Sequence, residues 1–107
     1  MSWKRWLPNY EVPKMVEKLV NAGILKDKTS YRDIVPHFET VLPNGDEVVL
    51  WVDHPDPARR AFPDGPRYGL DLFKPSDTKE TIFGSNKLSE TLEALQSLLQ
   101  RQGMGCL

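Results

Sequence analysis

Residues 36–52 read PHFETVLPNGDEVVLWV and contain two β-rich runs that flank the turn Pro43-Asn44-Gly45. Proline presets φ at the first turn position, asparagine tolerates the second, and glycine accepts the positive φ of a bulge. The stretch therefore predicts an antiparallel hairpin with a three-residue loop.

This loop length fixes the register of the hairpin, because a shift by one residue would exchange its two faces. The expected facing pairs are Leu42 with Asp46, Thr40 with Val48, and Phe38 with Leu50. One face, expected in the core, carries Phe38, Thr40, Leu42, Val48, Leu50 and Val52. The other face carries His37, Glu39, Val41, Glu47, Val49 and Trp51. An exposed tryptophan beside valines is a candidate interaction surface.

Two amphipathic helices are predicted on either side of the strands. The first covers about residues 13–22, where Val12, Met15, Val16, Leu19 and Val20 recur at helical spacing. Gly23 is a natural left-handed stop for it. The second has the stripe Leu88, Leu92, Leu95, Leu98 and Leu99. Ser85 or Asn86 is its expected cap, and Gly103 follows its end.

Between the hairpin and the last helix, the pattern predicts a loop and one or two more strands. Residues 54–66 hold four prolines, which no regular ladder accommodates. Alternation then predicts a third strand over 67–73 and allows a fourth over 78–83. The result is an α+β fold, in which an antiparallel meander of three or four strands has an N-terminal and a C-terminal helix on one face.

Composition indicates one small domain spanning residues 1–107. The chain is 39% hydrophobic and 27% charged, and its longest apolar runs are far shorter than the roughly 20 residues of a membrane span. We expect residues 1–10 to form an arm and residues 103–107 a frayed tail. The single cysteine, Cys106, forms no intrachain disulfide, which favours a cytoplasmic location.

Charge is spread unevenly. Residues 1–30 carry six basic and three acidic groups, whereas residues 31–80 carry six basic and ten acidic groups. A nucleic-acid-binding protein would use the basic head, through Trp3, Lys4, Arg5, Lys14 and Lys18. The three acidic groups of residues 1–30 reduce the positive charge that would attract phosphates, so nucleic acid is the less favoured partner.

The run Asp53-His54-Pro55-Asp56 and the loop arginines are the other candidates. An aspartate beside a histidine suggests acid–base or metal chemistry, but two histidines and no paired cysteines leave a metal short of ligands. Arg59, Arg60 and Arg67 form a candidate anion site, or else pair with nearby aspartates and hold the loop. A small-ligand-binding or enzymatic domain would use His54, Arg59 and Arg60.

The sequence contains no phosphate-binding glycine loop, nucleophile elbow or paired metal ligands. We therefore expect a small non-enzymatic protein-interaction domain of inhibitor, immunity, adaptor or self-associating type, without cofactor or metal. Its partner is another protein or a second copy of itself. Tryptophan and arginine are enriched at interface hot spots, so the expected contact residues are Trp51, Val49, Val41, Arg59, Arg60 and Arg67.

Overall fold

The computed structural model describes residues 2–101 and 103. Its elements are α1 (Ser2–Trp6), α2 (Lys14–Asn21), β1 (Lys26–Asp27), β2 (His37–Val41), β3 (Glu47–Val52), a 3-10 turn (Pro57–Arg59), β4 (Tyr68–Phe73), β5 (Lys79–Ser85) and α3 (Leu88–Arg101). Apart from Gly103, the expected tail lies outside the described residues. In the described part of the chain, no helix has the length and apolar character that crossing a membrane requires.

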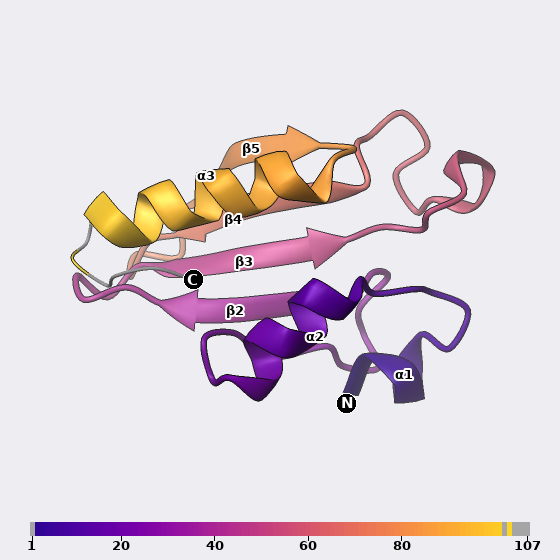
Figure 1. The fold of residues 1–107 in the computed structure, drawn as a ribbon, viewed down its shortest axis with the longest axis horizontal. Coiled ribbons are helices and arrows are strands. Elements are labelled where there is room, and N and C mark those ends of the chain that lie inside the picture. The colour runs from indigo at the N-terminus through magenta and orange to yellow at the C-terminus, as the bar shows by residue number, and fades with distance from the viewer. Residues whose placement is uncertain (1, 102, 104–107) are drawn as a thin grey trace.

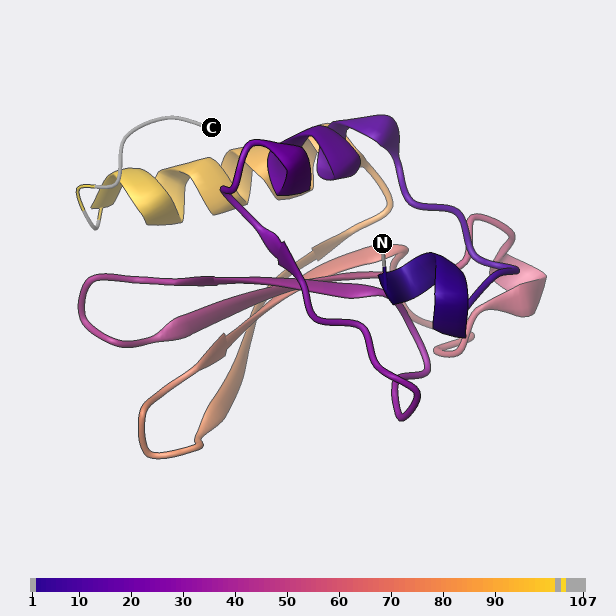
Figure 2. The same ribbon diagram turned by 90° about the horizontal axis from the view of Figure 1, so that it is seen from below.

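The strands form one antiparallel sheet in the order β1-β2-β3-β4-β5. Figures 1 and 2 show α2 and α3 on the same side of this sheet, with α3 along β4 and β5. The predicted α+β meander with helices on one face is confirmed, and the fourth expected strand is present as β5. The two-residue strand β1 was not predicted, because its charged residues resemble a loop.

The hairpin of β2 and β3 has the predicted register. Phe38 faces Leu50 and Thr40 faces Val48. Gly45 has a φ of 90°, as the bulge position requires, and its N–H donates to the carbonyl of Leu42 at 2.9 Å. Local turn chemistry therefore sets which side chains reach each face of the sheet.

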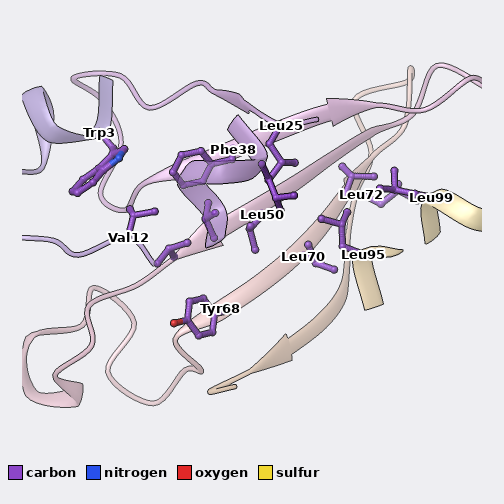
Figure 3. Packing of buried hydrophobic residues seen from close by; sticks show 14 of the residues in the cluster. Trp3, Val12, Leu25, Phe38, Leu50, Tyr68, Leu70, Leu72, Leu95 and Leu99 are labelled. Atoms are coloured by element: carbon purple, nitrogen blue, oxygen red, sulfur yellow. The ribbon is translucent and has the colours of Figure 1, made fainter. Parts of the chain in front are cut away.

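The core lies between the sheet and the helices. Phe38 and Leu50 from the hairpin, Leu70 from β4 and Leu95 from α3 are all at most 1% exposed. Figure 3 shows the α3 leucines directed toward β4, while Trp3 and Val12 close the other end of the cluster. One residue of the predicted first stripe, Met15, is 46% exposed, so the buried stripe of α2 is narrower than its apolar pattern.

The first ten residues, expected as an arm, include the helix α1. Trp3 is buried, and its backbone N–H donates to Asp27 Oδ2 at 3.2 Å. Trp6 remains 39% exposed and contacts the ring of Tyr31. The large apolar area of Trp3 explains why this segment folds back onto the core.

Candidate functional site

The face of the sheet turned away from α2 and α3, called here the open face, carries a second set of side chains. Strand register arranges them in three rows across β2, β3, β4 and β5. The rows are His37, Trp51, Gly69 and Gly84; then Glu39, Val49, Asp71 and Thr81; then Val41, Glu47, Phe73 and Lys79. The hairpin residues among them are the six that the sequence assigned to this face.

A concavity of about 700 Å³ lies on the open face. Its floor is made by residues of the three rows, including Trp51, Val49 and Phe73. Its walls come from two connecting segments, residues 33–35 before β2 and residues 62–66 before β4. The concavity therefore joins an apolar floor to walls that the sheet itself does not supply.

Trp51 is seated by a glycine on the adjacent strand. The two residues face each other across β3 and β4, and a Cβ at Gly69 would lie 1.9 Å from Cζ2 of the indole. The ring of Phe62 packs against the indole with 5.8 Å between centroids. These contacts fix an aromatic pair at the end of the concavity nearest the proline-rich loop.

The position of Phe62 depends on Asp53, which is 0% exposed. One carboxylate oxygen of Asp53 accepts hydrogen bonds from the backbone N–H groups of His54 at 2.7 Å and Ala61 at 3.0 Å. The other accepts from the N–H of Phe62 at 3.1 Å. A buried carboxylate is stable when several donors satisfy it, so Asp53 holds the loop in one conformation.

His37 lies between two carboxylates at the edge of the concavity. Its Nδ1 is 3.1 Å from Asp33 Oδ2, and its Nε2 is 3.0 Å from Glu39 Oε2. The imidazole therefore links the connecting segment before β2 to the strand β2 itself.

Acidic groups outnumber basic groups around the concavity. Its lining includes the carboxylates Asp33, Glu39, Glu47 and Asp71, and the ammonium of Lys79. The lining stays negative whether His37 is neutral or charged. A surface that joins apolar area to negative charge favours a partner with apolar and cationic groups.

Asp71 differs from the other three carboxylates because it is only 8% exposed. Its Oδ1 is buried and has no hydrogen-bond partner among the described residues. Thr81 faces it across β4 and β5. This side chain is a buried carboxylate in the floor of the concavity.

The other sequence candidates lie elsewhere. His54 is buried, its Nδ1 accepts from the N–H of Asp56 at 3.0 Å, and its Nε2 lies 3.1 Å from the carbonyl of Asn9. The accepting Nδ1 places the ring proton on Nε2, which donates to that carbonyl. Both nitrogens are therefore used within the fold.

The loop arginines bind mostly to backbone carbonyls. Arg60 donates to the carbonyls of His54 at 2.9 Å and Gly65 at 3.2 Å. Arg67 donates to the carbonyl of Glu11 at 3.0 Å. The side chain of Arg59 is 70% exposed and reaches Asp56 at 4.0 Å. Arg60 and Arg67 thus stabilise the loop, and none of the three lines the concavity.

Of the expected contact residues, Trp51 and Val49 line the concavity. Val41 is 59% exposed at the end of β2, in the same row as Glu47. Among the residues of the nucleic-acid alternative, Trp3 is buried, whereas Lys14 and Lys18 are exposed on α2. Lys4 and Arg5 lie over the rings of Trp3 and Trp6.

Sequence reasoning missed Asp71, Phe62 and the pair of carboxylates around His37. Alternation along the predicted strand 67–73 puts Asp71 on the same side as Gly69 and Phe73, but it does not show which residues of other strands lie beside it. Its position beside Val49 depends on the pairing of β3 with β4, which no local turn signal specifies. Phe62 lies in an irregular loop, so no periodicity marks it.

Two tyrosines near these elements titrate above their ordinary value. Burial, and to a smaller extent the charge of Asp53, raises the pKa of Tyr10 above 10.0. Burial also raises the pKa of Tyr68 above 10.0, against an opposing effect of Arg67. Both phenols therefore favour the neutral form.

Within residues 2–101 and 103, no group of three or more histidine, cysteine or carboxylate side chains is placed to hold a metal ion. No protein-family model, curated protein or solved structure matches this chain. The open face is thus interpreted from its own geometry and charge.

Proposed function

We propose that this chain is a non-catalytic protein-interaction domain whose open face binds a basic, partly apolar segment of another protein in the cytosol. The observation that supports the proposal most directly is the concavity with an aromatic and aliphatic floor and an excess of carboxylates in its lining. Apolar area supplies affinity, and the negative lining selects the charge of the partner.

A protein segment suits this site better than an enclosed small molecule. Small-molecule sites bury most of their ligand's surface. Here the walls come from two connecting segments beside one face of a sheet, and the apolar floor spans β3 and β4. A loop or an extended segment of a partner would lie across that floor with its side chains between the walls.

The test is a titration of the isotopically labelled protein, followed by amide chemical shifts. One probe is a capped five-residue peptide of alternating leucine and arginine, and the other has glutamate in place of arginine. We expect the basic peptide to shift amides of β2, β3 and β4, and the acidic peptide to shift none. Equal effects of both peptides, or shifts confined to α1 and α2, would overturn the proposal.

Charge variants identify the surface used. Glu47→Gln removes one carboxylate from the lining of the concavity. It is expected to lower the affinity for the basic peptide by about two- to five-fold, as the loss of an exposed ion pair does. Glu80→Gln is the matched control, because Glu80 is exposed on β5 and does not line the concavity. Equal weakening by both variants would show only a general charge effect.

The alternative occupant is a second copy of the chain, and light scattering over a concentration series separates the two. A monomer at all concentrations is expected from the proposal. If the chain forms a dimer, and Trp51→Glu dissociates that dimer without unfolding the chain, the open face binds a second copy. That result would overturn the proposal that the partner is a different protein.

A further inference from the structure

Asp71 lies at the centre of the open face. It faces Val49 on one side and Thr81 on the other, and strand alternation gives it Gly69 and Phe73 as neighbours on the same face of β4. The ring of Trp51 lies over Gly69. The direct neighbours of Asp71 are therefore apolar at Val49, Gly69 and Phe73 and polar at Thr81, and Glu47 and Lys79 lie diagonally from it in the next row.

The carboxylate of Asp71 is incompletely satisfied. The residue is 8% exposed, its Oδ1 has no hydrogen-bond partner among the described residues, and no hydrogen bond joins it to the hydroxyl of Thr81. A buried acceptor oxygen without a donor costs free energy. An apolar residue at this position would avoid that cost, as Leu70 and Leu72 do on the other face of the same strand.

The closest cation in the lining does not remove this cost. Lys79 lies in the next row, opposite Phe73, and is exposed. Its ammonium forms no ion pair with a carboxylate of the described residues. Among the described residues, Asp71 is thus an acceptor in the floor of the concavity without a donor from its own chain.

We propose that Asp71 is the anchor for an arginine side chain of the partner segment. The inference rests on the proposed function and names the group that the concavity recognises. A guanidinium is planar, donates two parallel hydrogen bonds to one carboxylate, and packs well beside aromatic rings. The second torsion of an aspartate is broad, so the carboxylate turns to present both oxygens without movement of β4.

This assignment predicts opposite effects on stability and binding. Asp71→Val replaces an unpaired carboxylate by a β-branched apolar residue, which suits a buried strand position. The variant is expected to have a higher melting temperature than wild type and to bind the arginine-containing peptide no longer. Asp71→Asn keeps the shape of the side chain and removes its charge. It is expected to lower the affinity for the arginine-containing peptide at least ten-fold.

The deciding experiment compares three capped peptides by calorimetry and amide shifts. They have the same leucine framework and carry arginine, citrulline or lysine at the central position. Citrulline keeps the shape of arginine without its charge. Wild-type protein is expected to bind the arginine peptide at least ten-fold more tightly than the citrulline peptide, with lysine between them, and Asp71→Asn is expected to abolish this preference.

The outcomes distinguish the proposal that Asp71 binds arginine from the proposal that the open face binds the partner. If Asp71→Asn binds the arginine peptide as wild type does while Glu47→Gln weakens it, the anchor is wrong and the binding face stands. If wild-type protein binds none of the peptides, both proposals fail. If Asp71→Val and Lys79→Met each lower the melting temperature, the carboxylate is paired within the chain and the anchor is again wrong.

Discussion

The indole of Trp51 occupies the space that a side chain at Gly69 would fill. A Cβ at position 69 would lie 1.9 Å from Cζ2 and 2.0 Å from Cε2 of the ring. No Cβ approaches a non-bonded heavy atom so closely, so the glycine on β4 is a condition for the position of the tryptophan on β3. The floor of the concavity is therefore set by the absence of a side chain.

The first prediction concerns this pair. Gly69→Ala forces the indole out of its place and is expected to cost about 1–3 kcal/mol of unfolding free energy, as overpacking does. Urea unfolding measures the cost, and tryptophan fluorescence reports the moved ring. The same substitution in a Trp51→Leu background should cost less. An equal cost in both backgrounds would mean that the strand, and not the ring, rejects the methyl group.

The second prediction concerns the loop that carries Phe62. Asp53→Asn replaces one acceptor oxygen by an amide that faces backbone N–H groups, so it is expected to cost about 1–3 kcal/mol and to speed tryptic cleavage after Arg59. Asp64→Asn, at an exposed loop position, is the control and should change neither. Unchanged protease resistance of the Asp53 variant would show that the prolines alone hold the loop.

The third prediction tests the packing of α3 on the sheet. Leu95 is 0% exposed, so Leu95→Ala is expected to cost about 2–5 kcal/mol through lost apolar burial and a residual cavity. Met15→Ala changes a residue that is 46% exposed and should cost less than about 0.5 kcal/mol. Similar values for the two variants would contradict the arrangement of the helices.

The fourth prediction is a loss of stability at alkaline pH. Burial raises the pKa of both Tyr10 and Tyr68 in the folded protein above 10.0. Below the unfolded value both states keep the phenolic protons, and the contribution to stability is present in full. Above it the unfolded chain releases its protons first, so stability falls as pH rises toward the folded pKa.

The measurement is urea unfolding between roughly pH 9 and pH 11, which brackets the ordinary tyrosine pKa. Tyr68→Phe keeps the buried ring and removes the titrating group, so its stability should fall less steeply with pH. A fall of equal steepness in Tyr68→Phe and wild type would assign the effect to other groups.

An element of the fold could be predicted from the sequence where residues close together in the chain determine it. The β2–β3 hairpin was predicted to the residue because Pro43, Asn44 and Gly45 determine its loop and the loop determines its register. The helix α1 was not predicted, because five residues are too few to show helical periodicity.

The candidate site could be predicted from the sequence only in part. The hairpin half of the open face, with Trp51 and Val49, could be assigned from alternation alone. The β4 half required the pairing of β3 with β4, and the β5 side includes an irregularity beside Asp71 that shifts the register. The arginines of the loop were expected to face carboxylates or a partner, but Arg60 and Arg67 bind backbone carbonyls, which no sequence pattern identifies.

The sequential order of the sheet has a consequence for synthesis on the ribosome. Each strand pairs only with strands adjacent to it in the chain, so every new hairpin can form as soon as its second strand emerges. The inner face of β4, with Leu70 and Leu72, must then wait for α3, which is translated after β5. During that interval the nascent chain exposes a sheet with an uncovered apolar surface, and this is the stage at which chaperone binding or aggregation is expected.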